Sequence, residues 1–191
     1  MNSSVLLSRG EFPSEEESDL ELTTPFISFS QVQEIASELF DSEGAIYSED
    51  EIEISEKLSP LIENGRALHQ ELLDKVAESE EWNTLSEEEK DSIINFSNDQ
   101  HVVLSLIYFL DNPNLEYEAN EAGIDAGVIK DCVSFALGVR GIQEIIQNTK
   151  SLITVKDTIK VLKIIGRRYL GFVGLAWMIW DFMDCVASFN D

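Results

Sequence analysis

The sequence predicts an all-α protein, a small helical bundle preceded by a disordered acidic arm. Apolar residues recur at spacings of three and four along most of the chain, which is the period of an α-helix, whereas the alternation of a β-strand is nowhere sustained. Serine, proline and acidic residues stand where helices would begin. The chain has 191 residues, of which 43% are hydrophobic, so it can bury one core. Helices of typical length would number about five to seven.

The arm is expected over residues 1–25. This stretch is rich in serine and glutamate, so it has too little apolar surface to offset the entropy lost when a chain is ordered. A first short helix is predicted at residues 30–40. Residues 49–56 alternate acidic side chains with two isoleucines, as a strand would, but the stretch is short and isolated and we expect a linker.

Three helices are expected in the middle of the chain. Ser59 and Pro60 are typical of an N-cap followed by proline in the first turn. Residues 86–89 read Ser-Glu-Glu-Glu, a capping box in which the serine and the third glutamate each satisfy a free amide. Residues 102–110 are almost all apolar and end before Asn112-Pro113, which predicts a buried helix too short to span a membrane.

Beyond Pro113 the chain is polar up to Ile124, and further helices are predicted at residues 131–138, 142–147 and 155–165. We therefore divide the chain into the arm at residues 1–25, an acidic helical region at residues 26–129 and a C-terminal cassette at residues 130–191, which is basic first and then apolar.

The net charge of −24 is unevenly distributed between these parts. Residues 1–129 hold 31 acidic and five basic residues, a net −26, whereas residues 130–191 hold six acidic and eight basic residues, a net +2. Residues 140–168 alone carry a net +5. So acidic a chain repels nucleic acid, and we expect no nucleic-acid partner.

A basic amphipathic helix is the first candidate functional feature. Its cations fall on one stripe, at successive spacings of four, three and four, and continue into a second arginine: Lys156, Lys160, Lys163, Arg167 and Arg168. Apolar residues occupy the opposite stripe. Such a helix rests on an anionic membrane or docks on an acidic partner, although the stripe is equally well explained as a solvated face or as packing against the acidic part of the chain.

The apolar run at residues 169–180 is the second candidate functional feature. Twelve residues without a charge would span about 18 Å as a helix, short of the ~30 Å hydrocarbon core. Tyr169, Trp177 and Trp180 suit a membrane interface and suit a protein core as well. Complete burial of this run under the helices at residues 61–76 and 102–110 would favour the core, and loose cover would favour the membrane.

An enzyme is not expected. His69 and His101 fall in separate predicted helices without a cysteine or carboxylate at metal-ligand spacing. The sequence has no glycine-rich phosphate loop, nucleophile elbow or zinc-helix signature, and its acidic runs lack the spacing of a calcium loop. We predict neither a cofactor nor a metal.

Cys132 and Cys185 lie near the two ends of the cassette. Reduced, they would pack as small apolar groups, and oxidised, they would close a long loop. The first ten residues lack the charged and apolar regions of a secretory signal, so we expect synthesis in the cytoplasm, with export left to a dedicated exporter.

Several segments of the cassette form a recognisable series: Cys132, Ala136-Leu137-Gly138, Ile142-Gln143-Glu144-Ile145-Ile146, Ile164-Ile165-Gly166-Arg167-Arg168-Tyr169-Leu170-Gly171, Gly174, Asp181-Phe182 and Asp184-Cys185. Through them residues 130–187 resemble a tail found in small, mostly uncharacterised bacterial proteins, some of which look like exported bacteriocin-type precursors. The resemblance implies that the cassette is one unit and that its cysteines are able to pair. Such proteins usually carry a secretory or lipoprotein leader, from which this sequence departs.

The favoured hypothesis is a non-enzymatic, bacteriocin-like protein whose acidic helical region masks a cationic, membrane-active cassette that contacts anionic headgroups. The first alternative is a soluble acidic interaction protein, such as an immunity protein, an inhibitor or a phage-encoded binder, whose acidic face meets a basic partner and whose C-terminal helices are its core. A structural component of a larger assembly is a further alternative.

Overall fold

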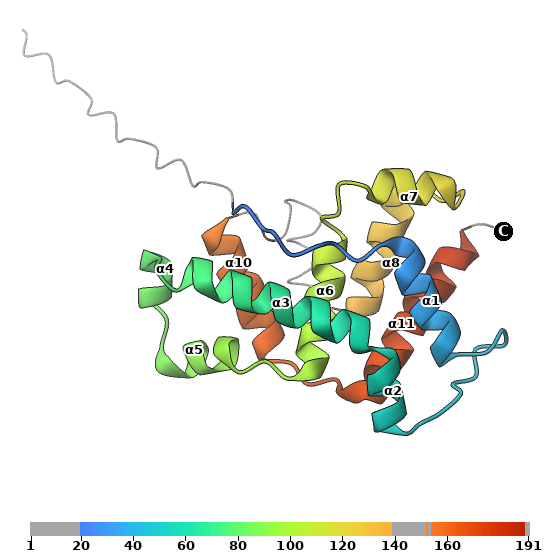
Figure 1. Ribbon diagram of the computed structural model, residues 1–191, viewed down its shortest axis with the longest axis horizontal. Helices are drawn as coiled ribbons and strands as arrows, with labels where there is room; N and C mark the ends of the chain where they lie inside the picture. The colour runs from blue at the N-terminus through green and yellow to red at the C-terminus, as the bar shows by residue number, and fades with distance from the viewer. Residues whose placement is uncertain (1–19, 139–151, 153, 190–191) are drawn as a thin grey trace, which may run out of the picture.

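The computed structural model describes residues 20–138, 152 and 154–189, and within them the predicted all-α class is confirmed. The described chain forms ten helices and no strand, with one isolated bridge between Phe40 and Ile46. The helices make one bundle (Figure 1). Their bounds are α1 Phe29–Leu39, α2 Glu51–Lys57, α3 Ser59–Val76, α4 Glu80–Asn83, α5 Glu87–Ile94, α6 Asn98–Phe109, α7 Leu115–Glu121, α8 Ala126–Leu137, α10 Val155–Gly166 and α11 Gly171–Ser188.

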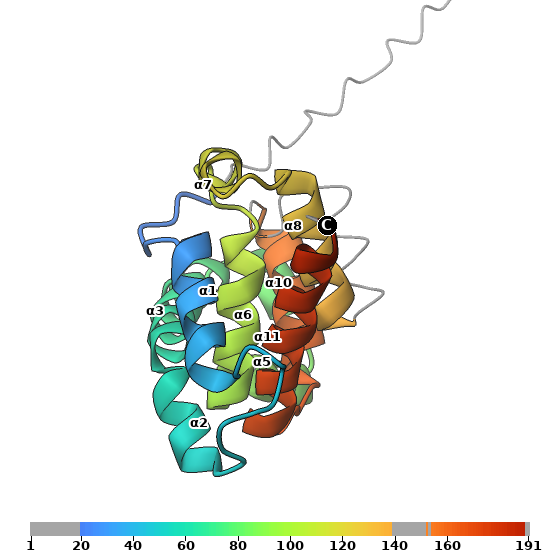
Figure 2. The same ribbon diagram turned by 90° about the vertical axis from the view of Figure 1, so that its right-hand side faces the viewer.

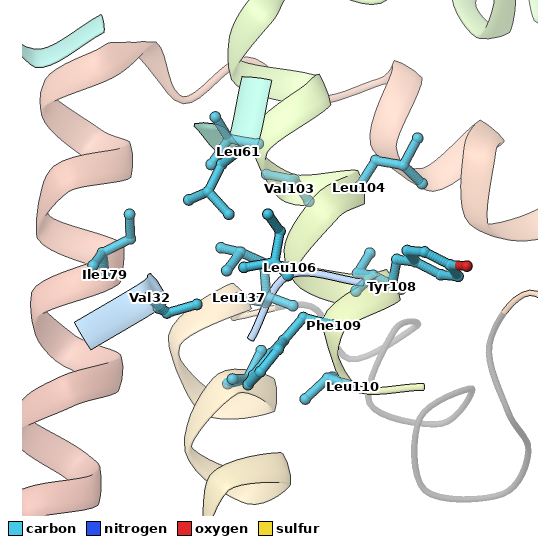
Figure 3. Close-up of a cluster of buried hydrophobic side chains, with 14 of the residues drawn as sticks. Val32, Leu61, Val103, Leu104, Leu106, Tyr108, Phe109, Leu110, Leu137 and Ile179 are labelled. Carbon is cyan, nitrogen blue, oxygen red and sulfur yellow. The ribbon is translucent and has the colours of Figure 1, made fainter. Parts of the chain in front are cut away.

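Helix α6 lies at the centre of the bundle, as the predicted burial of residues 102–110 requires. Every residue from 99 to 110 is buried, and α6 runs between α1 and α3 on one side and α10 and α11 on the other (Figure 2). Side chains of α6 such as Leu106 and Phe109 meet Val32 of α1, Leu137 of α8 and Ile179 of α11 (Figure 3). One core therefore joins the acidic region to the cassette.

The closest helix crossing joins α3 to α6. Gly65 of α3 sits against the main chain of α6, and a Cβ at this position would lie 1.9 Å from the carbonyl oxygen of His101. Glycine is required here because another helix backbone occupies the space of a side chain. Ser105 donates a hydrogen bond to Asn64 across the same crossing at 2.8 Å.

The end of the predicted arm is attached to the bundle. The main-chain and hydroxyl groups of Thr23 and Thr24 donate four hydrogen bonds to the carboxylate of Glu71 in α3, at 2.6–3.0 Å. Burial raises the pKa of Glu71, but these four bonds outweigh it and the net pKa is lowered. Residues 20–25, which the sequence assigned to the disordered arm, are therefore held against α3. Residues 1–19, the rest of the predicted arm, lie outside the described residues.

Other sequence predictions need correction. Residues 51–57 form helix α2 and not a linker, because Asp50 accepts hydrogen bonds from the amides of Ile52 and Glu53 and so caps the helix, which buries Ile54. Ser59 is the first residue of α3, one position after the N-cap. The short helices α4 and α7 were not predicted, since four and seven residues carry little periodicity. The capping box of Ser86 and Glu89 is confirmed.

The cassette is not a separate structural unit. Its predicted boundary at residue 130 falls inside α8. Helix α10 packs on α3, α4, α5 and α6, whereas α11 packs on α1, α2, α6 and α8. The two helices therefore complete different halves of the bundle. The helix predicted at residues 142–147 lies outside the described residues.

Candidate functional site

Helix α10 presents the predicted cationic stripe. Thr154 caps the helix by accepting a hydrogen bond from the amide of Asp157 at 3.1 Å. The apolar stripe is buried at Ile159, Leu162 and Ile165, and Lys156 and Lys160 are exposed on the opposite face. The helix is amphipathic as predicted, and its first two lysines point to solvent.

The last turn of the stripe forms ion pairs with α5. Glu89 accepts from Lys163 at 2.7 Å and lies 3.4 Å from Arg167. The hydrogen bond from Lys163, aided by the main-chain amide of Ser86, lowers the pKa of Glu89 to about 2. Two of the predicted contact cations are thus already paired with an acidic residue of the same chain, as one of the alternative interpretations of the stripe expects.

The joint between α10 and α11, at residues 167–170, is held by α6. The side-chain amide of Gln100 donates to the carbonyl oxygens of Ile165, Gly166 and Arg168 at 2.8–3.2 Å. Asp99 accepts from the main-chain amide of Leu170 at 2.9 Å. These bonds satisfy groups that a helix end leaves free, and they fix the start of α11.

Arg168 occupies a different environment from the other cations of the stripe. Its guanidinium donates to the carbonyl oxygen of Leu137 at the end of α8, at 2.9 Å, and burial lowers its pKa. Within the part of the chain that the structure describes, no carboxylate lies within ion-pair distance of it. Arg168 is therefore a partly desolvated cation to which the described residues give no counter-charge.

These cations line a shallow groove along α10, which we call the cationic groove. It has a volume of about 660 Å³, and its exposed lining is mostly apolar in spite of its charges. The described lining residues are Lys156, Asp157, Ile159, Lys160, Lys163, Ile164, Arg167 and Arg168.

Helix α11 is longer than the predicted apolar run, because it continues past Asp181 to Ser188. Among the described residues it is the helix long and apolar enough to cross a membrane, and a third of it (33%) is buried, although a core helix of a soluble protein meets the same criterion. Tyr169, just before it, is 81% exposed and Trp177 is 42% exposed. The run at residues 169–180 is thus covered on one side, by α8, α1, α2 and α6.

A tight turn shields Trp180, the third predicted contact aromatic. Asp41 accepts hydrogen bonds from the amides of Glu43 and Ala45, which closes the turn between α1 and α2. Gly44 in this turn has φ of +80° and rests on the indole of Trp180, where a Cβ would lie 2.4 Å from the ring. Phe40 packs beside both Trp177 and Trp180, at 5.4 and 5.2 Å between ring centroids.

Cys132 and Cys185 form a disulfide that ties α8 to α11, so the pairing that the sequence left open is made in this structure. Their Cα atoms are 5.6 Å apart. Cys132 is buried and Cys185 is half-buried. Helix α11, whose apolar run is covered on one side, is therefore covalently fixed to its main neighbour, α8.

The structure also brings together two histidines that were expected in separate helices. His101 lies 3.3 Å from His69, whose other ring nitrogen contacts the carbonyl oxygen of Ile93 at 2.7 Å, and Phe96 stacks on His69. Burial lowers the pKa of both, to about 4 for His101. The contact is made between helices 32 residues apart, so no spacing in the sequence indicates it.

A metal site of three or more His, Cys, Asp or Glu side chains does not occur among residues 20–138 and 154–189. Comparison with protein-family models, curated proteins and solved structures finds no match to this chain.

Proposed function

We propose that this protein acts on anionic membranes, in the manner of a bacteriocin, with α11 as the membrane-active element that the bundle holds until it is released. The observation that carries the proposal is the exposure of α11: an 18-residue apolar helix, 33% buried, with an exposed tryptophan in its first half and an exposed tyrosine just before it. Apolar surface of this kind is stable in contact with lipid and costly in water.

The length of α11 matches the thickness of a membrane better than the length of the predicted apolar run at residues 169–180. Eighteen residues rise about 27 Å, close to the ~30 Å thickness of the hydrocarbon core. Asp181 and Asp184 lie in its second half and oppose deep insertion while they are ionised. These charges favour an interfacial position in which Tyr169 and Trp177 lie at headgroup depth and the lysines of α10 meet the anionic surface.

The bundle restrains α11 through three groups of contacts. Its apolar face fills the core through Leu175, Ile179 and Phe182, the turn at residues 41–46 covers Trp180, and the disulfide ties Cys185 to α8. Of these, the disulfide is the restraint that a change of redox conditions removes, so reduction by a dithiol is expected to loosen α11.

The test is dye leakage from vesicles that contain phosphatidylglycerol, with the full chain before and after reduction. The proposal expects little leakage from the oxidised protein and more from the reduced protein and from the double variant Cys132→Ser/Cys185→Ser. Phosphatidylcholine vesicles serve as the control and should remain intact. If the reduced protein and the double variant leave anionic vesicles intact, the membrane proposal is wrong.

A soluble acidic binding protein is the second candidate, and the contribution of α11 to the shared core favours it. Leu175 is fully buried and Ile179 is 1% exposed, so release of α11 would open the core. In this case the acidic surface steers a basic protein partner to the bundle. Saturable, salt-sensitive binding of a basic protein by the oxidised protein, combined with intact vesicles in both redox states, would support this candidate over the first.

A further inference from the structure

We infer that the cationic groove on α10 is a binding site for one anionic lipid molecule, with the headgroup on the cations and the first part of the acyl chain on the apolar lining. This inference deepens the proposed function, on which it rests, by naming the class of ligand and the site. The groove belongs to the folded, oxidised bundle, so it is available before α11 is released.

Two cations of the groove form no ion pair within the described part of the chain and are open to a headgroup. Lys156 and Lys160 are exposed, and none of the ion pairs among the described residues involves them. One carboxylate, Asp157, lies between them in the sequence, and it is occupied as part of the N-terminal cap because its Oδ2 accepts from the hydroxyl of Thr154 at 3.0 Å. In a chain of net charge −24, two cations one helical turn apart thus have no ion-pair partner among the described residues.

Arg168 gives the second, independent observation. Its guanidinium is half-buried against the end of α8 and has a carbonyl oxygen for a partner in place of a carboxylate. A desolvated guanidinium retains donors that match the paired oxygens of a phosphate. An anionic headgroup in the groove would supply the counter-charge that the described chain does not give.

The lining favours a lipid over a free anion. Ile159 and Ile164 and the carbon chains of the lysines make the exposed lining mostly apolar, and a volume of about 660 Å³ suits a molecule with an apolar part. A nucleic acid is disfavoured, because the described lining has no aromatic ring on which a base would stack and the net charge repels a polyanion.

The inference is tested on the oxidised full chain by calorimetric titration with dihexanoyl phosphatidylglycerol below its critical micelle concentration. We expect saturable binding of one lipid per protein. The variant Lys156→Gln/Lys160→Gln should weaken binding at least tenfold, because it removes the two exposed cations of the groove. The matched control Lys57→Gln/Lys130→Gln makes the same change of charge on α2 and α8, outside the groove, and should bind as the wild type does.

Several results would overturn the inference. Equal affinity for dihexanoyl phosphatidylcholine would show that the groove does not recognise the negative charge of the headgroup. Equal affinity for inorganic phosphate would show that it does not recognise the acyl chains. Equal losses in the groove variant and in the control would show a diffuse charge effect. Competition by a synthetic peptide of residues 1–19 as effective as the lipid would assign the groove to the acidic arm instead.

The failure of this inference and that of the proposed function are distinguishable. The titration uses no bilayer and no reductant, whereas the leakage test depends on both. Lipid binding without leakage would remove the membrane-active role of α11 and keep the site on α10. Leakage by the reduced protein without saturable lipid binding would keep the proposed function and remove the site.

Discussion

Loss of the Cys132–Cys185 disulfide should cost this protein about 4 kcal/mol of its free energy of unfolding. The two cysteines are 53 residues apart in the sequence, and the bond prevents the unfolded chain from separating them. In the chain-entropy model a loop of this length gives about 4 kcal/mol at 25 °C. Loss of this amount would remove a large part of the ~5–15 kcal/mol typical of a folded domain.

The measurement is urea unfolding of the wild type with and without a dithiol reductant, followed by tryptophan fluorescence. With a slope of about 2 kcal/mol per molar urea, the midpoint should fall by about 2 M on reduction. The same fall is expected for Cys132→Ser/Cys185→Ser, which should no longer respond to the reductant. Identical midpoints for the oxidised and reduced wild type would refute the reasoning, since they would show that the bond does not restrain the unfolded chain.

Three further perturbations probe helix packing and charge. Gly65→Ala should destabilise the protein by about 3 kcal/mol in urea unfolding, because the added Cβ overlaps the carbonyl oxygen of His101. In the control Gly174→Ala the added Cβ meets no atom closer than 3.8 Å, so this change should be neutral or stabilising by up to about 1 kcal/mol. Glu89→Gln removes the ion pairs between α5 and α10, so it should speed amide hydrogen exchange in the last turn of α10. Glu88→Gln makes an equal change of charge on an exposed residue and should leave this exchange unchanged. Equal effects of the two variants would contradict a role for the ion pairs. His101 has a pKa of about 4 in the folded protein against an ordinary 6.5, so between these pH values the unfolded chain takes up a proton that the folded chain does not. Stability should therefore fall by about 3 kcal/mol as the pH drops through this window, and His101→Gln should reduce that slope in denaturant titrations; an unchanged slope would exclude the histidine as its source.

The elements that the sequence predicted well are those whose signal is local. The capping box at Ser86 is satisfied within four residues, and the apolar run that became α6 is buried on every side, so both could be recognised without knowledge of the fold. Helix α2 was missed because seven residues with one buried isoleucine resemble a short strand as closely as a helix, and the cap at Asp50 decided the outcome. The division at residue 130 falls inside α8, because charge, which suggested it, describes the surface and not the packing.

The candidate site was predicted in part for the same reason. The stripe on α10 follows from its periodicity, but the pairing of Lys163 and Arg167 with Glu89 joins residues more than seventy positions apart. The contact between the two histidines and the cover of Trp180 by Gly44 likewise depend on how helices cross.

The sequence by itself determined the all-α class, the central apolar helix, the uneven distribution of charge and the amphipathic character of α10, because each arises from neighbours within a few turns of one helix. The tertiary structure decided which of the described cations are paired, that the two cysteines meet and how much of α11 is covered. These properties depend on contacts between distant helices, and such contacts are selected by the packing of the whole core around α6, which no local period encodes.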